Sequence, residues 1–339
     1  MTFSRRRRED LRGRYAPTLA PVWLMAAAAL AAVAVLAVGF YYLAHHLIAA
    51  GQAPGTPVQA GDVIKATVTI LTLIGAVLAG LYAYRKQLLA EGDAHRADAA
   101  QLANRYAAAA EQLGHDRAAV RLAGVYALAR LADDWAEQRQ VCIDVLCAYL
   151  RMPYRTDPDH PGYREGEREV RHTVIRVIRA HLQDPGATTT WCGVGLYFTG
   201  AHFDGGDFSG SHFVGGTVDF TGATFGGGTV DFTGATFGGD RAGFLSARFD
   251  DGVVNFAGAR FLAGTVDFDW ATFDGGRIAF SGAHFDGGRV TFDHATFSDG
   301  SVSFADATLA GDPPRFAHAE FRRTRFRWGP ILPPSAGQA

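Results

Sequence analysis

Phenylalanine recurs every twelve residues through the C-terminal half of this 339-residue chain. The first series keeps that spacing without interruption: Phe208, Phe220, Phe232, Phe244, Phe256, Phe268, Phe280, Phe292, Phe304 and Phe316. A second series follows five residues behind: Phe213, Phe225, Phe237, Phe249, Phe261, Phe273, Phe285, Phe297, Leu309 and Phe321. A fixed short period indicates one structural unit stacked on copies of itself. The spacing therefore predicts a repeat fold, and it favours a scaffold over an enzyme.

The repeated unit contains two five-residue segments followed by two extra residues. Residues 218–229 read VDFTGATFGGGT, so a V-x-F-x-G segment precedes an A-x-F-x-G segment. Positions two residues apart point to the same side of an extended chain. The glycines after each phenylalanine allow a turn at low steric cost. The unit therefore predicts short strands with Phe and Val or Ala on the inner side, joined by tight corners.

Before residue 214 the two extra residues are missing, and Phe198, Phe203, Phe208 and Phe213 follow each other at a spacing of five. Here the chain resembles the pentapeptide-repeat family, whose unit has a central Leu or Phe and a small apolar residue two positions earlier. The resemblance covers residues 194–328, and the extra pair after every second segment departs from the family pattern. It implies the fold known for that family, a right-handed quadrilateral β-solenoid, here with a sequence period of 12.

The length of one coil depends on the corners. If the extra pairs widen two of four corners, a coil takes two of the twelve-residue units, and alternate members of the first Phe series stack in two internal ladders. Coils about 4.8 Å apart would then give a rod about 25–30 Å long. A narrow coil of one unit is the alternative, although it must fit two Phe and two smaller apolar residues into each layer. Propeller blades repeat at about 40 residues, so the period disfavours a propeller.

Two apolar segments precede the repeats. Residues 15–61 contain no Asp, Glu, Lys or Arg, and residues 66–84 form a second charge-free run. A helix needs about 20 apolar residues to cross a bilayer. We predict transmembrane helices at 19–49 and 63–84, joined by an external loop at 50–62. A cleaved signal peptide is the alternative for the first run, but signal cores are shorter and a second span follows here.

Basic residues predict the orientation of these spans. They flank the spans on one side only, as Arg5, Arg6, Arg7 and Arg8 in the N-terminal segment 1–18 and Arg85 and Lys86 after the second span. The loop between the spans has no basic residue. Because basic loops stay on the cytoplasmic side, we expect a multi-pass protein of the bacterial inner membrane with both termini in the cytoplasm.

Residues 85–190 are expected to form an α-helical linker domain. A helical stalk at 87–113 is rich in good helix formers. Asp116 is the expected cap of the next helix, and further helices are predicted at about 137–150 and 167–182. The stretch RLAGVYALARLADD resembles the HEAT or armadillo-like helices that often precede bacterial pentapeptide repeats. The solenoid is then expected at 191–328, followed by a disordered tail at 329–339.

The repeat segment is acidic. Residues 194–314 hold fifteen Asp and five Arg, a net charge of −10. Four aspartates that precede a ladder Phe form a candidate acidic face: Asp207, Asp219, Asp231 and Asp267. Calcium binding is the alternative, but the dense GGxGxD spacing of calcium-binding repeats is missing, which favours solvated carboxylates.

The sequence contains no phosphate-binding loop, no HExxH, no nucleophile elbow and no CxxC. Its three cysteines, Cys142, Cys147 and Cys192, have no metal-ligand spacing. We therefore expect no enzyme activity, no catalytic residue, no cofactor and no metal site.

These features predict a membrane-anchored scaffold that presents a solenoid face to another protein on the cytoplasmic side. The expected partners are the lipid bilayer and a cytoplasmic protein, and not nucleic acid. The alternative is an acidic nucleic-acid mimic, because some pentapeptide-repeat proteins resemble duplex DNA and inhibit DNA gyrase. A membrane anchor argues against that alternative. A third class, a sensor or transport accessory, has no ionisable residue in mid-membrane to support it.

Overall fold

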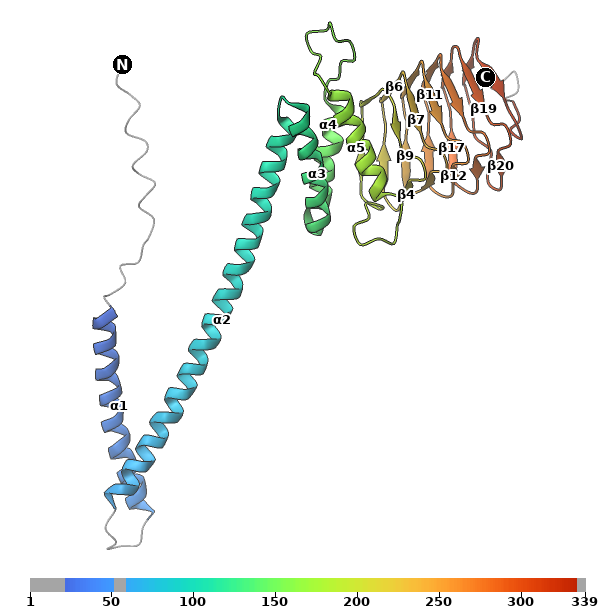
Figure 1. Cartoon of the computed structure of the whole chain (residues 1–339). Coiled ribbons are helices and arrows are strands. Elements are labelled where there is room, and N and C mark those ends of the chain that lie inside the picture. The colour runs from blue at the N-terminus through green and yellow to red at the C-terminus, as the bar shows by residue number, and fades with distance from the viewer. Residues whose placement is uncertain (1–21, 52–58, 334–339) are drawn as a thin grey trace, which may run out of the picture. The chain divides into compact units, whose positions relative to one another are not determined.

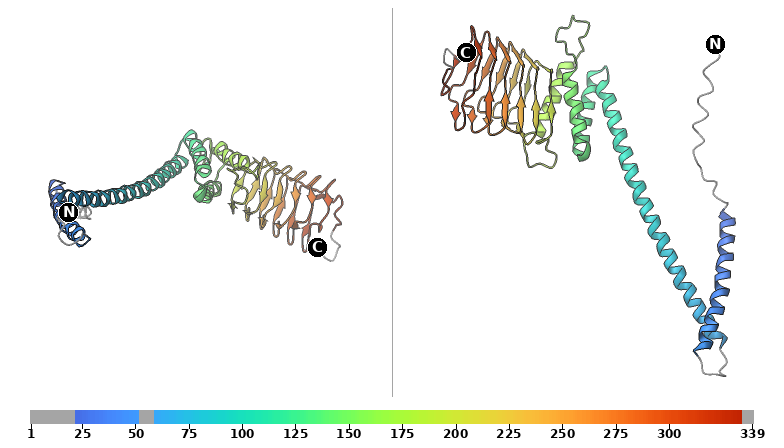
Figure 2. Two further views of the ribbon diagram at one scale, coloured as in Figure 1. Left: turned by 90° about the horizontal axis from the view of Figure 1, so that it is seen from below. Right: turned by 180° about the vertical axis from the view of Figure 1, so that it is seen from behind.

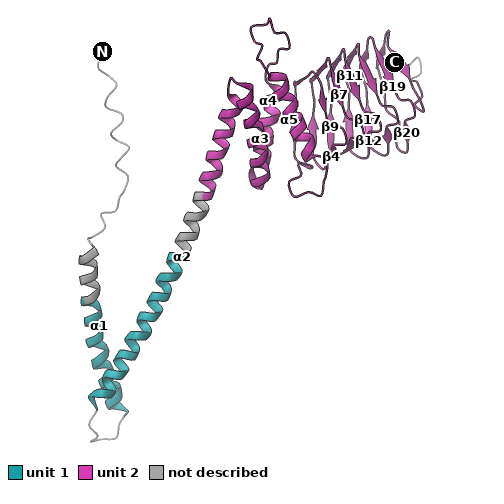
Figure 3. Cartoon of the chain, in the orientation of Figure 1, with its two compact units in different colours: residues 1–96 teal, residues 97–339 magenta. Residues whose placement is uncertain are grey.

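The computed structural model describes residues 22–51 and 59–333, without the side chains of residues 22–30 and 88–97. The chain divides into two compact units, residues 1–96 and residues 97–339 (Figure 3). Across the described ranges, α-helices come first and short strands follow from residue 196 onwards (Figure 1).

The first unit contains α1 (Val22–Ala50) and the first part of α2 (Ala60–Gly114). Two segments, Ala31–Ala50 and Ala60–Gln87, are long and apolar enough to cross a membrane, with mean hydropathies of 1.7 and 2.0. α2 begins before the predicted span and continues through the predicted stalk without a break. The basic segment at 1–18 lies outside the described residues, as do residues 52–58 of the predicted loop.

The second unit begins with a helical region that the sequence pattern locates well. It contains α3 (Ala118–Asp134), the 3₁₀ turn η1 (Ala136–Gln138), α4 (Arg139–Arg151) and α5 (Glu167–His181). α5 turns Val170, Val174 and Ile178 inward at helical spacing, and all three are buried. The three helices pack on one another, and α4 and α5 also contact the first strands of the solenoid.

The predicted cap of α3 is wrong. The N-cap residue is Arg117, whose backbone is extended, and no side chain caps the helix. The amide of Arg117 donates instead to Nδ1 of His115 at 3.0 Å. Asp116 lies one residue too early because the buried guanidinium of Arg121 binds the carbonyl oxygens of His115 and Asp116 and fixes the bend there.

The strands that follow the helical region form four parallel sheets (Figures 1 and 2). Sheet A contains β1 (Leu196–Tyr197), β5 (Thr217–Asp219), β9 (Arg241–Gly243), β13 (Thr265–Asp267) and β17 (Arg289–Thr291). Sheet B contains β2 (His202–Phe203), β6 (Thr224–Gly226), β10 (Arg248–Asp250), β14 (Thr272–Asp274), β18 (Thr296–Phe297) and β21 (Glu320–Phe321).

The other two sheets alternate with the first two along the chain. Sheet C contains β3 (Gly206–Asp207), β7 (Thr229–Asp231), β11 (Val253–Asn255), β15 (Arg277–Ala279), β19 (Ser301–Ser303) and β22 (Arg325–Arg327). Sheet D contains β4 (His212–Val214), β8 (Thr236–Gly238), β12 (Arg260–Phe261), β16 (His284–Phe285) and β20 (Thr308–Leu309). The chain therefore visits sheets A, B, C and D in turn, and these parallel sheets stack into a β-solenoid of about 6 turns.

The register between neighbouring coils follows the extra residue pairs. Val230 pairs with Val254, and Val254 with Ile278, so each partner lies two repeat units further along the chain. Leu196 pairs with Val218, a separation that is shorter by one extra pair. The first coil is shorter because that pair is missing in the run spaced by five.

The interior consists of stacked phenylalanine rings. Along each of the two ladders of the first series, ring centroids are 4.6–5.1 Å apart and planes lie within 11° of parallel. Rings of one ladder meet those of the other edge to face, at 5.9–6.3 Å and 82–90°. Both geometries are favourable for aromatic pairs. The second series stacks in the same way, as in Phe225 on Phe249 at 4.9 Å.

Tight stacking also explains glycines at the corners between repeat units. A Cβ atom at Gly228 would overlap the carbonyl oxygen of Asp204 in the preceding coil, and one at Gly239 would overlap that of Gly216. Gly228 also has a φ of +64°, which L side chains rarely adopt. Glycine is therefore required where one coil crosses closely over another.

Both ends of the solenoid are covered. At the first end, Ile175 of α5 lies against Gly206 of β3. At the last end, Trp328 stacks on Phe326 at 4.5 Å and meets Phe316 edge-on at 5.4 Å. The ordered end of the solenoid extends past its predicted boundary at residue 328, since Ile331 is buried, with 3% of its surface exposed. Residues 334–339 of the predicted tail lie outside the described residues.

Replacing Phe256 with alanine should lower the free energy of unfolding by about 3–5 kcal/mol, the usual cost of truncating a packed phenylalanine. Phe256 is fully buried and stacks on Phe232 and Phe280, both at 4.9 Å. Urea unfolding of the full chain in detergent, followed by circular dichroism, measures the change. Arg277→Ala, which alters an exposed side chain on β15, should change stability by less than about 0.5 kcal/mol. Equal urea midpoints of unfolding for the two variants would show that the phenylalanine ladder does not stabilise the fold.

Candidate functional site

The four aspartates of the candidate acidic face lie on two different sheets. Asp219 and Asp267 are on sheet A, whereas Asp207 and Asp231 are on sheet C. Each carboxylate accepts the amide N–H of the residue two positions further on, at 2.8–2.9 Å. This is the side-chain turn that Asp favours at chain reversals. The aspartates therefore hold corners of the coil, and the structure does not gather them on one face.

Charge also changes sign along sheet A. The position of Asp219 is occupied by Gly243, Asp267 and Thr291 in later coils, and Thr291 bridges to Arg315. Arg241 pairs with Asp267 at 2.8 Å. Burial opposes ionisation of Asp219, but hydrogen bonds from Thr221 and Thr199 outweigh it and lower the pKa of that carboxyl. Sheet A is thus a mixed polar surface in which carboxylates alternate with other residues.

The residues that predict the membrane orientation are only partly described. Arg85 and Lys86 lie on α2 directly after the charge-free run 66–84, and both are exposed. Arg5, Arg6, Arg7 and Arg8 lie outside the described residues.

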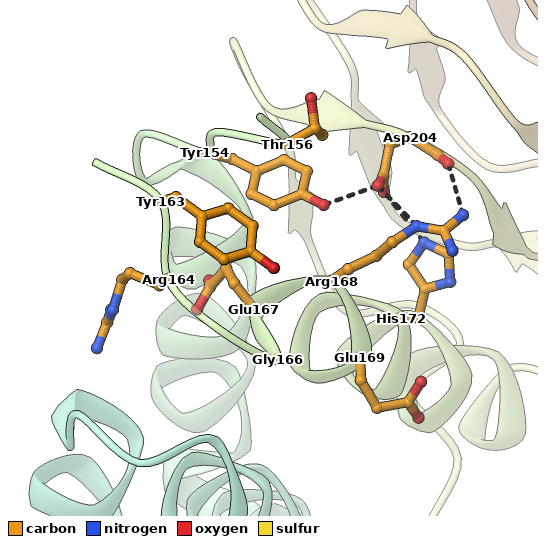
Figure 4. Close-up of a pocket in the computed structure, with 10 residues that line it drawn as sticks. All are labelled: Tyr154, Thr156, Tyr163, Arg164, Gly166, Glu167, Arg168, Glu169, His172 and Asp204. Carbon is orange, nitrogen blue, oxygen red and sulfur yellow. Dashed lines mark hydrogen bonds and ion pairs between the residues drawn. The ribbon is translucent and has the colours of Figure 1, made fainter. Parts of the chain in front are cut away.

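A pocket of about 510 Å³ lies between the loop after α4, the start of α5 and the first coil of the solenoid (Figure 4). Its lining side chains are mostly polar or charged: Tyr154, Thr156, Tyr163, Arg164, Glu167, Arg168, Glu169, His172 and Asp204. None of these residues belongs to a motif or repeat that would predict a site from the sequence.

Asp204 is the centre of the pocket's hydrogen bonds. It accepts from the Tyr154 hydroxyl at 2.7 Å and from Nε of Arg168 at 2.9 Å, and Nε2 of His172 lies 3.1 Å from Oδ1 (Figure 4). Burial opposes its charge, but these three contacts outweigh burial and hold the pKa of Asp204 well below its usual range. Burial and the bond to Asp204 raise the pKa of Tyr154.

Two buried arginines tie this region together. Arg171 donates to the carbonyl oxygens of Leu150 and His202, at 2.6 and 2.8 Å, and its guanidinium lies 4.6 Å from the centre of the Tyr154 ring. Arg121 lies 3.3 Å from Glu167, which also accepts from the Tyr149 hydroxyl at 2.8 Å. Buried charges require such partners. The bond from Arg171 to His202 fastens the helical region to the first coil, and the other contacts join the helices to one another.

Within the described residues, the pocket does not assemble a nucleophile-activating triad. A histidine beside a carboxylate is one part of a nucleophile-activating triad. In the described part of the chain, however, no hydroxyl or thiol hydrogen-bonds His172. The polar side chains of the pocket join the loop after α4, α5 and the first coil through Asp204.

The cysteines are packed in the core or against it. Cys142 and Cys147 are fully buried, and burial raises the pKa of Cys147 to about 12. Cys192 is half-buried, and none of these three cysteines forms a disulfide. Among the residues that the structure describes, no group of three or more His, Cys, Asp or Glu could hold a metal ion.

Comparison with known families identifies the solenoid. Residues 198–248 match the family described as pentapeptide repeats, in nine copies. The chain carries a pentapeptide-repeat solenoid. No curated protein and no solved structure matches the chain. The matched region of the pentapeptide-repeat solenoid includes both the run spaced by five and the first twelve-residue units, and the sheets continue in register beyond it.

Asp204→Asn should weaken the junction between the helical region and the pentapeptide-repeat solenoid. A lowered carboxyl pKa means that the ionised form stabilises the fold above the unfolded-state pKa of about 3.9, and this stability is lost as pH falls below it. We expect the variant to lose about 1.5–3 kcal/mol of unfolding free energy at pH 7. It should also show a shallower decline in stability than the wild type in acid.

Chemical denaturation at pH 7, 5 and 3 measures both effects. Asp306→Asn is the matched control, because Asp306 is exposed and its carboxylate has no hydrogen bond or ion pair in the ranges described. If Asp204→Asn has the stability of the wild type at pH 7 and loses stability equally between pH 7 and pH 3, the Asp204 carboxylate does not stabilise the junction.

Proposed function

We propose that this protein is a membrane-anchored scaffold that presents its solenoid to another protein on the cytoplasmic side. The observation that carries the proposal is the separation of inside from outside in the repeats. The phenylalanine ladders fill the interior, so the outward side chains of the strands are free to vary without disturbing the fold. Pentapeptide-repeat solenoids generally act as structural or interaction scaffolds. Long regular faces of this kind are typical binding surfaces.

The apolar helices support the membrane anchor. Their side chains remain exposed over most of both segments, with only 6% and 11% of the apolar windows buried. Such surface is stable in lipid and not in water. Lys65, near the start of α2, is exposed and can extend its amine to the headgroups. Arg85 and Lys86 at the other end favour the cytoplasmic side for the solenoid.

The four sheets support a four-sided rod with chemically different faces. The strands of sheet A carry both Asp and Arg, whereas the outer position of sheet D is filled in successive coils by His212, Thr236, Arg260, His284 and Thr308. A partner can therefore distinguish one face from another by charge and hydrogen bonding.

A nucleic-acid mimic is the second candidate, and the net charge of −10 over residues 194–314 is the observation in its favour. Several of those carboxylates are paired with arginine on the solenoid surface. Examples are Arg241 with Asp267 and Arg260 with Asp286, at 2.8 and 3.0 Å. Regular phosphate-like charge is thus interrupted, which favours the protein scaffold.

Site-specific photo-crosslinking in spheroplasts tests the proposal with the full chain. A photoreactive residue replaces Arg241, Thr272, Arg277 or His284, one on each of sheets A, B, C and D. We expect a defined cytoplasmic protein to be captured from one or two sheets only. We also expect external protease to leave the solenoid intact. A photoreactive residue at Leu47 in α1 serves as the membrane control.

Capture from none of the four sheets, or digestion of the solenoid by external protease, would contradict the proposal. Inhibition of DNA gyrase supercoiling by the purified chain, with no crosslinked partner, would favour the mimic instead.

A further inference from the structure

At the corner between sheets A and B, several coils carry side chains at a backbone conformation that favours glycine. The turn from sheet A to sheet B passes in each coil through a residue with φ between +55° and +71°. In chain order these residues are Gly200, Gly222, Ser246, Trp270, His294 and His318. At the turn from sheet C to sheet D the corresponding residues are Gly210, Gly234, Gly258, Gly282 and Asp306.

The contrast between the two corners points to function. A positive φ is unfavourable for residues with a Cβ, and most so for bulky ones. Gly222 shows that glycine forms the same turn, so the fold does not require Trp270 or His294. Strained positions of this kind persist where the side chain has a role beyond the turn.

The three aromatic side chains form an exposed stack, named here the aromatic corner (Trp270, His294 and His318). The rings of Trp270 and His294 are 4.3 Å apart and 7° from parallel, and those of His294 and His318 are 5.0 Å apart. Trp270 is 59% exposed. Within the described residues its ring stacks only on His294, and the coil before it carries Ser246 at this position. One face of the indole is therefore free for a ligand.

The surroundings of the free indole face are acidic. Asp274, on the strand that follows Trp270, is exposed, and its carboxylate has no hydrogen bond or ion pair in the part of the chain described. Asp269 and Asp267 precede Trp270 on the sheet A side. Burial, together with the nearby carboxylates of Asp267 and Asp293, raises the pKa of Asp269. In the coil that precedes Trp270, Arg241 is paired with Asp267 and Arg248 with Asp250.

We propose that the aromatic corner is the docking site for an arginine- or lysine-bearing segment of the partner protein, with the cation placed over Trp270. Tryptophan is the best aromatic partner for a cation, and it is enriched among residues that dominate binding energy. The net negative charge of the repeats attracts a basic segment and repels an acidic one. This inference rests on the proposed scaffold function and names the face and the chemistry of the partner.

Fluorescence anisotropy with a labelled eight-residue peptide of alternating Arg and Gly tests the site. The full chain is held in uncharged detergent at one salt concentration. Trp270→Gly should weaken binding about fivefold, and Trp270→Phe should retain most of it. The glycine variant should fold, because Gly222 occupies the same corner, and a thermal melt checks this.

Two charge variants keep the test decisive if Trp270→Gly fails to fold. Asp274→Asn and Asp306→Asn each remove one exposed carboxylate, but only Asp274 lies on a strand that begins at the aromatic corner. We expect about twofold weaker binding for Asp274→Asn and no change for Asp306→Asn. Unchanged binding by a folded Trp270→Gly chain, or equal effects of the two aspartate variants, would overturn the inference.

Equal binding of a peptide with Glu in place of Arg would also overturn it. In the crosslinking experiment, an equal yield of captured partner for the wild type and Trp270→Gly would overturn this inference and leave the scaffold function intact. Failure of the scaffold function would appear instead as no capture by the wild type.

Discussion

Face-to-face stacking of phenylalanine at one strand spacing is the interaction on which the solenoid depends. Parallel strands in a sheet lie about 4.8 Å apart, and the ladder rings follow each other at 4.6–5.1 Å. The same interaction decides the length of a coil. Phe232 stacks on Phe208, two repeat units away, whereas Phe220 meets Phe208 edge-on at 82°. The narrow twelve-residue coil would require Phe220 to stack on Phe208.

A uniform interior leaves the corners and outer strand positions as the places where the coils can differ. Gly228 and Gly239 cannot vary, because the backbone of the preceding coil is too close. Ser246, Trp270, His294 and His318 do vary at a single corner, where the aromatic side chains stack on one another at the surface. Binding function is therefore expected on the outside of the fold, while the ladders keep the spacing of any outer pattern constant.

The sequence predicts the repetitive parts of this structure and fails where contacts are non-local. The phenylalanine period and the apolar helix spacing are local signals, so they locate the ladders and the α3–α5 helices. Asp204 could not be identified, because its partners Tyr154, Arg168 and His172 are 32–50 residues away and follow no pattern. Trp270 departs from the Gly222 position, but this is visible only once the register between coils is known. The predicted cap of α3 is wrong because a buried arginine, Arg121, decides where that helix begins.

Cysteine crosslinking between coils tests the register of two repeat units per coil most directly. Arg248 on β10 pairs with Thr272 on β14, and Cα atoms one strand spacing apart are within reach of a disulfide. The full chain with Arg248→Cys and Thr272→Cys should form that disulfide under mild oxidation, as identified by mass spectrometry of the joined peptides. A chain with Arg248→Cys and Arg260→Cys should not, because residue 260 lies on sheet D. Crosslinking of the second pair and not the first would show a twelve-residue coil and contradict the ladder architecture.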